Sequence, residues 1–60
     1  MKTYEVSIRP FGVNRIYKTY TVHSDNKSKA ERVAETAFYQ DEPDKYNLPV
    51  RWQYRSEEIK

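Results

Sequence analysis

Three segments of the chain alternate apolar and polar residues with the period of a β-strand. In residues 3–9 the apolar positions are Tyr4, Val6 and Ile8, and residues 16–23 and 50–56 alternate in the same way. A period of two is typical of strands that bury one face. The residues between the first two segments form turns readily and include the one glycine of the chain, so these segments predict a β-hairpin with a loop of roughly five or six residues.

A helical pattern follows the second of these segments. Its apolar residues recur at positions i, i+3, i+4, i+7 and i+8, and they are Ala30, Val33, Ala34, Ala37 and Phe38. This spacing places all of them on one face of an α-helix of about 14 residues. The sequence therefore predicts one amphipathic helix whose apolar stripe packs on the sheet.

Both ends of this helix carry recognisable signals. Ser24, Asp25 and Asn26 are all residue types that cap helix N-termini. We favour Asn26, because it leaves residues 27–29 as the first helical turn before the apolar stripe begins. Pro43 ends the helix, since the residue before a proline avoids the helical conformation.

The order of these elements predicts an α+β fold of the type ββαβ. A right-handed crossover through the helix places the third strand beside the first, which gives a three-stranded antiparallel sheet in the order 2-1-3 with the helix on one face. Residues 44–49 are expected to form a loop from which Tyr46 and Leu48 fold back onto the core. Residues 57–60 are expected to be a frayed tail of a single domain, residues 1–60. The side chains expected to face the helix are those of Tyr4, Val6, Ile8, Tyr20, Val22, Val50, Trp52 and Tyr54.

Composition excludes several classes of function. The chain has no cysteine and one histidine, so it can form no disulfide and has too few ligands for a zinc site. His23, Ser24 and Asp25 are adjacent, and neighbours in an extended chain point in alternate directions, so they cannot form a catalytic triad. A single glycine excludes phosphate-binding loops. We therefore expect no enzymatic activity, no cofactor or metal, and no small-molecule substrate.

Apolar residues nowhere form a run long enough to cross a membrane. We expect a soluble, cytoplasmic protein with no membrane partner. Asp41, Glu42 and Asp44 lack the alternating spacing of a calcium-binding loop. These three acids are expected to form a solvated, acidic end of the helix.

Charge is unevenly distributed along the chain. The formal net charge of +2 is too small to require a nucleic-acid partner, but residues 1–30 carry six basic and two acidic side chains. Two lysines fall at the start of the expected helix, where the helix dipole disfavours them. In the predicted topology one end of the molecule gathers a basic rim, made of Lys2, His23, Lys27, Lys29 and Arg55. This rim is a candidate site for an anion or an acidic partner, and the alternative interpretation is a solvated charged surface.

The sheet face opposite the helix, here called the open face, is the second candidate site. Alternation assigns it three arginines and one glutamate, a formal charge of +2. Arginine and tyrosine are enriched at protein interfaces, so a protein partner is expected. The residues expected to bind it are Arg9, Tyr17, Arg51, Gln53 and Arg55. RNA-binding sheets stack bases on two or three aromatic side chains, whereas Tyr17 is the one aromatic residue assigned to this face. A third interpretation is that the open face is solvated and has no function.

Residues 16–56 also resemble a known group of proteins. They combine a strand, a capped helix with an alanine-rich stripe, an acidic loop and a last strand that carries arginines. This arrangement is similar to that of small early proteins of lytic phages, in particular the short inhibitors of host RNA polymerase. The resemblance implies a non-catalytic viral protein that blocks a host machine by direct contact, with Arg51 and Arg55 matching the arginines of the last strand.

The sequence thus favours a monomeric binding protein, a viral regulator or inhibitor, that contacts a protein through the open face and the basic rim. In a host cell it would act in the cytoplasm, on machinery such as RNA polymerase. One alternative is a weak, salt-dependent binder of single-stranded nucleic acid that uses Tyr17, Lys27, Lys29, Arg51 and Arg55. Another is a structural subunit of a larger assembly.

Overall fold

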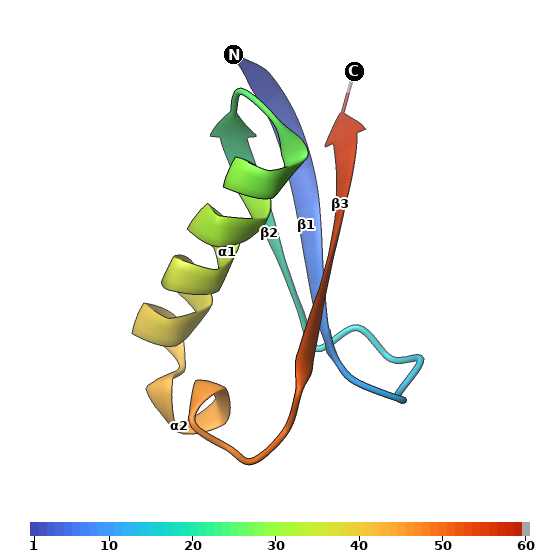
Figure 1. Ribbon diagram of the computed structural model, residues 1–60, viewed down its shortest axis with the longest axis vertical. Coiled ribbons are helices and arrows are strands. Elements are labelled where there is room, and N and C mark those ends of the chain that lie inside the picture. The colour runs from blue at the N-terminus through green and yellow to red at the C-terminus, as the bar shows by residue number, and fades with distance from the viewer. Residues whose placement is uncertain (60) are drawn as a thin grey trace.

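The computed structural model describes residues 1–59, which form an antiparallel sheet crossed on one face by a long helix (Figure 1). The elements are β1 (Lys2–Pro10), β2 (Lys18–Ser24), α1 (Lys27–Asp41), α2 (Pro43–Tyr46) and β3 (Trp52–Ile59). The strands lie in the order β2-β1-β3. This confirms the predicted α+β fold and the central position of the first strand.

The central strand fixes which residues face the helix. Tyr4, Val6 and Ile8 of β1 are buried beneath α1. Val6 lies opposite Tyr20 of β2 and Ser56 of β3, so the even-numbered residues of all three strands share this face. Because β2 and β3 are both antiparallel to β1, they run parallel to each other, and α1 supplies the crossover between them.

The helix buries a narrower stripe than its sequence pattern predicts. Ala30, Ala34 and Phe38 are fully buried, and the two small alanines allow the helix to approach the sheet closely. Val33 belongs to the predicted stripe but is 50% exposed. With about 3.6 residues per turn, Val33 lies at one edge of the arc that these five positions span, and it remains on the outer side of α1.

The end of the chain is more ordered than predicted. Residues 57–59 belong to β3, where Glu57 lies opposite Glu5 and Ile59 lies opposite Thr3. The expected frayed tail is therefore wrong for these residues, and residue 60 lies outside the described part of the chain. The reason is the length of β1, whose first residues supply pairing partners for the end of β3.

The connections also differ from their predictions. The loop between β1 and β2 spans residues 11–17, which is longer than expected. Pro43 ends α1 as predicted but also begins α2, where its missing N–H costs no hydrogen bond. Tyr46 packs on Phe38 with ring centroids 6.3 Å apart, as expected. Leu48 is 44% exposed, so its predicted return to the core is wrong.

Asn26 caps the N-terminus of α1. Its side-chain oxygen accepts a hydrogen bond from the backbone N–H of Lys29 at 2.9 Å. Asn26 has an extended backbone conformation, as residues at this position usually do. The favoured cap among the three candidates is confirmed.

Replacing Asn26 by alanine measures the strength of this cap. Asn26→Ala is expected to lower the free energy of unfolding by about 1 kcal/mol, because the acceptor for the Lys29 N–H is lost while the core stays intact. Urea unfolding followed by circular dichroism gives the value. The control is Gln40→Ala at an exposed helical position, expected to change stability by less than about 0.5 kcal/mol. Equal losses in the two variants would contradict the role of Asn26.

Candidate functional site

The open face brings together some of the predicted binding residues. Arg9 of β1 lies opposite Gln53 of β3, and Arg55 lies opposite Ser7. Both arginines line a shallow hollow of about 310 Å³ on this face. The hollow is lined by Glu5, Ser7, Arg9, Asn14, Ile16, Arg55 and Glu57. The proximity of Arg9, Gln53 and Arg55 agrees with the strand alternation, and their role in binding stays a prediction.

The charge of the open face is not the expected +2. Glu57 joins this face because β3 continues beyond its predicted end, and it lies opposite Glu5. Arg51 leaves it, since β3 begins only at Trp52. The Arg55 guanidinium lies 3.5 Å from the Glu57 carboxylate. The hollow therefore carries balanced charge, with two arginines and two glutamates in its lining.

Tyr17 does not lie on the open face, so this part of the predicted site is wrong. Its ring packs against Phe38 and Trp52 on the helix side, with centroid distances of 5.9 and 5.6 Å. Tyr17 precedes β2, and the strict alternation of a strand does not extend to it. The open face thus loses the one aromatic residue that the sequence had assigned to it, which removes the support for base stacking.

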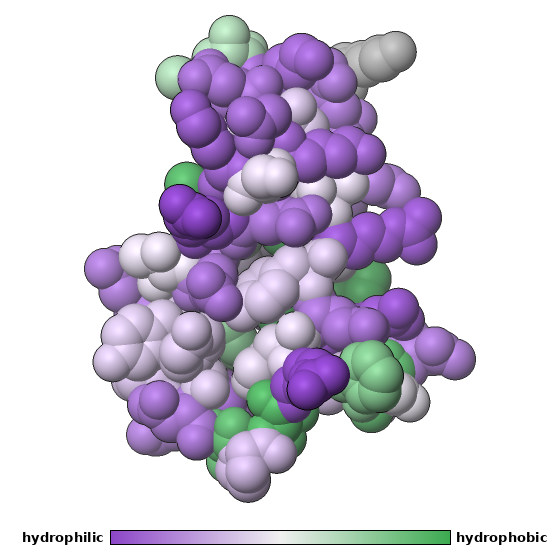
Figure 2. Space-filling view, viewed as in Figure 1, coloured by the Kyte–Doolittle hydropathy of each residue, from purple (hydrophilic) through white to green (hydrophobic). Residues whose placement is uncertain are grey.

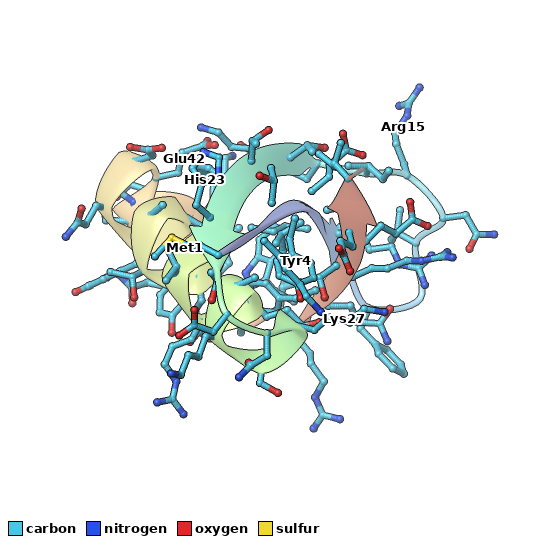
Figure 3. All side chains as sticks on the ribbon, turned by 90° about the horizontal axis from the view of Figure 1, so that it is seen from above. Met1, Tyr4, Arg15, His23, Lys27 and Glu42 are labelled. Atoms are coloured by element: carbon cyan, nitrogen blue, oxygen red, sulfur yellow. The ribbon has the colours of Figure 1, made fainter. Side chains whose placement is uncertain are left out.

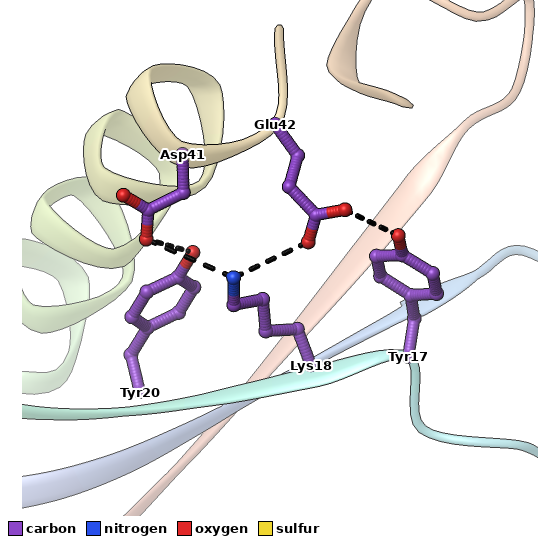
Figure 4. A network of polar contacts seen from close by, with 5 residues as sticks. All are labelled: Tyr17, Lys18, Tyr20, Asp41 and Glu42. Carbon is purple, nitrogen blue, oxygen red and sulfur yellow. Dashed lines mark hydrogen bonds and ion pairs between the residues drawn. The ribbon is translucent and has the colours of Figure 1, made fainter. Parts of the chain in front are cut away.

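A network of polar contacts joins the end of α1 to β2 (Figure 4). The Tyr17 hydroxyl donates to Glu42 at 2.5 Å, and the Tyr20 hydroxyl donates to Asp41 at 2.9 Å. Between them the Lys18 ammonium lies 3.2 Å from Glu42 and 3.8 Å from Asp41. The side chain of Asp41 is 52% exposed, in line with the predicted solvated helix end, but Asp41 and Glu42 also have polar partners that the sequence did not predict. Sequence reasoning missed the network because its partners are 21 and 25 residues apart, beyond any local pattern.

These contacts shift the ionisation of the groups that make them. The hydrogen bond from Tyr17 lowers the pKa of Glu42, and the same bond raises the pKa of Tyr17. The hydrogen bond to Glu42 also raises the pKa of Lys18. Each shift favours the charge state that the group already has at neutral pH. The network therefore attaches the end of the helix to the sheet.

The predicted basic rim does not form one cluster. Lys2 lies 3.9 Å from Glu58, and Lys29 lies 3.7 Å from Asp25. Arg55 is in the middle of β3, away from the rim. Figure 3, seen from above this end, shows His23 and Lys27 on different sides of Tyr4. The His23 ring instead makes a 3.0 Å hydrogen bond with the Thr3 hydroxyl. Ion pairing thus weakens the case for an anion site at this end.

A surface that the sequence did not predict lies at the opposite end of the sheet. We call it the loop end. It consists of the exposed apolar residues of two loops that a backbone hydrogen bond joins, and of one arginine: Phe11, Val13 and Ile16 between β1 and β2, and Leu48, Val50 and Arg51 before β3. The five apolar side chains are 39–60% exposed, with Phe11 the most exposed of them. In Figure 2 hydrophobic surface gathers at the lower end, over the two loops that supply these residues. Val50, expected in the core, lies here because it precedes β3.

The two loops of the loop end are held together. The backbone N–H of Phe11 donates to the carbonyl of Arg51 at 2.7 Å. The Arg51 guanidinium lies 6.0 Å from the centre of the Phe11 ring, within range of a cation–π contact. Gly12 turns the chain directly after Phe11 with a φ of 83°, a conformation that glycine adopts without strain. One signal in the sequence could have indicated this surface: Phe11 and Val13 are apolar residues on either side of the only glycine, outside every periodic segment.

Comparisons with known proteins give no information on the function of the chain. No protein-family model, no curated protein and no solved structure matches the chain. Within residues 1–59 no helix combines the length and the apolar character needed to span a membrane. The same residues contain no group of three or more histidine, cysteine, aspartate or glutamate side chains arranged to hold a metal ion.

Acid unfolding tests the contacts of Glu42. The pKa of Glu42 is lower in the folded protein than its ordinary value of 4.5. The Glu42 carboxylate therefore binds a proton less readily in the folded protein than in the unfolded chain. The resulting stabilisation is complete above about pH 4.5 and is lost as the pH falls. Glu42→Gln is expected to make the free energy of unfolding depend less on pH between about pH 5 and 3. Urea unfolding over a series of pH values measures this dependence.

A matched variant separates this effect from a general loss of charge. Glu58→Gln removes a carboxylate of an exposed ion pair with Lys2, whose atoms are 3.9 Å apart. Because exposed pairs contribute little, this variant is expected to retain the acid dependence of the original protein. An unchanged dependence in Glu42→Gln would contradict the assigned role of Glu42.

Proposed function

We propose that the protein is a non-enzymatic binding protein that contacts another protein through its loop end. The observation that carries this proposal is the pairing of Phe11 and Arg51, which come from separate loops yet are joined by a backbone hydrogen bond and a cation–π contact. Exposed apolar patches bordered by polar residues often mark protein interfaces.

The composition of the loop end supports a protein partner. Aromatic residues and arginine are enriched among the residues that dominate binding energy. The Arg51 guanidinium lies near the Phe11 ring and makes no ion pair within residues 1–59, so its N–H groups are available to a carboxylate. A partner surface with an apolar pocket for Phe11 and a nearby acidic side chain would match this arrangement.

The loop end is also well suited to binding because it is preorganised. The N–H of Val13 donates to the carbonyl of Pro10 at 3.2 Å, which closes a turn around Phe11. On the other loop the N–H of Val50 donates to the carbonyl of Leu48 at 2.7 Å. Loops that are already ordered lose less conformational entropy when a partner binds.

The resemblance to phage inhibitors supplies the class of partner to test first. On that basis the protein is a viral regulator that acts in the cytoplasm of a bacterial host, and its target is the host RNA polymerase. Contact through the loop end would then block the polymerase by occupying a surface, since the proposal includes no catalytic step.

Binding to purified bacterial RNA polymerase, measured by biolayer interferometry, tests the proposed function. Phe11→Ser and Arg51→Ala are each expected to weaken binding by more than about tenfold, because anchor residues of this kind contribute most of the affinity. Both residues are exposed and lie in loops, so the circular dichroism spectrum should be unchanged. Affinity capture from a bacterial lysate with the same variants extends the test to other protein partners.

The control is Val33→Ser, which removes an apolar side chain that is 50% exposed on α1, remote from the loop end. It is expected to bind as the original protein does. Undiminished binding by Phe11→Ser and Arg51→Ala would show that the contact surface is elsewhere. If neither the polymerase nor any lysate protein distinguishes the loop-end variants from Val33→Ser, the proposed function is wrong.

A further inference from the structure

The outer edge of β3 is a second feature suited to binding. β3 pairs with β1 on one side, and along its other side Figure 1 shows no further helix or strand of the described chain. The strand runs without proline or glycine from Trp52 to Ile59. An edge strand of this kind presents a row of backbone N–H and C=O groups that another strand can bond.

The charges on this edge are self-complementary. On the open face Arg55 and Glu57 lie on either side of Ser56, and their side chains are 80% and 66% exposed. In an antiparallel pair of identical strands centred on Ser56, Arg55 of each copy would lie opposite Glu57 of the other. We propose that the protein forms a twofold dimer in which the β3 strands of two copies pair in this register, making a continuous six-stranded sheet.

Charge selects this register over its neighbours. A twofold axis perpendicular to the sheet always places one residue opposite its own copy. Centring on Ser56 aligns residues 53–59 of both strands and makes two Arg–Glu pairs. Centring on Arg55 would place the two Arg55 side chains opposite each other, and centring on Glu57 would do the same for two carboxylates. Opposite charges across strands stabilise a sheet and like charges destabilise it, so Ser56 is the favoured centre.

The open face offers a second reason for pairing. Glu5 and Glu57 lie directly opposite each other within one copy, with one arginine, Arg55, beside Glu57. This arrangement places two like charges together in the isolated molecule. In the dimer a second arginine, from the other copy, approaches Glu57 and reduces the repulsion.

The helices leave room for the dimer. Both copies of α1 lie on the same face of the joined sheet, and the two β1 strands are three strand spacings apart, about 14 Å. Packed helices need about 8–10 Å between their axes. The other sheet edge is less suitable, because centring two copies of β2 on Thr21 pairs Thr19 with His23 and makes no opposite-charge pair.

Sedimentation equilibrium tests the dimer. At low salt the protein is expected to associate reversibly between about 10 µM and 1 mM, the range of weak interfaces. Arg55→Glu and Glu57→Arg are each expected to raise the dissociation constant at least about tenfold, because both cross-strand pairs become like-charge pairs. The double variant Arg55→Glu/Glu57→Arg restores opposite charges and should associate as the original protein does.

A mixture of the two single variants gives the sharpest test. One strand then carries acids at positions 55 and 57 and the other carries bases, so the mixture should form a heterodimer although neither variant associates alone. Arg32→Glu, on the exposed side of α1, makes the same charge change away from the edge and should leave association unchanged. A protein that stays monomeric at about 1 mM, or a mixture that does not associate, would overturn the proposal.

Discussion

The burial of Phe38 is the interaction on which the rest of the structure depends. Its side chain is fully buried, and the rings of Tyr17, Tyr46 and Trp52 lie around it at centroid distances of 5.9, 6.3 and 5.0 Å. These three residues belong to the β1–β2 loop, α2 and β3. One side chain on the helix therefore joins segments that are distant in sequence, which matters in a chain of 60 residues with a small core.

The contacts around Phe38 explain how α2 and the loops at the end of the molecule that carries them are held in place. The Trp52 indole N–H donates to the carbonyl of Lys45 at 3.2 Å, which holds α2 against the start of β3. Beside it the Glu42 network attaches the end of α1 to β2. With the helix, α2 and both strands held in this way, the two loops that follow are placed next to each other and their apolar side chains remain exposed.

The loop end and the β3 edge, the two surfaces proposed to bind proteins, differ in chemistry. The loop end combines apolar side chains with Arg51, a combination suited to a foreign protein with a pocket. The β3 edge offers backbone hydrogen bonds and paired charges, a combination suited to an identical strand. Because the two surfaces do not share a residue, a dimer joined along β3 would leave both loop ends available to partners.

The sequence by itself determined the elements whose signals are local. Strand alternation around Val6, the helical stripe of Ala30, Ala34 and Phe38, and the Asn26 cap all depend on neighbouring residues, and the sheet order follows from the handedness of the crossover. Of the candidate site, alternation placed Arg9, Gln53 and Arg55 together on the open face. Only the tertiary structure decided the direction of Tyr17, the ordering of residues 57–59 and the exposure of the loop end. These features depend on the position of Phe38 and the length of β1 relative to distant segments, and a local pattern carries no information about such contacts.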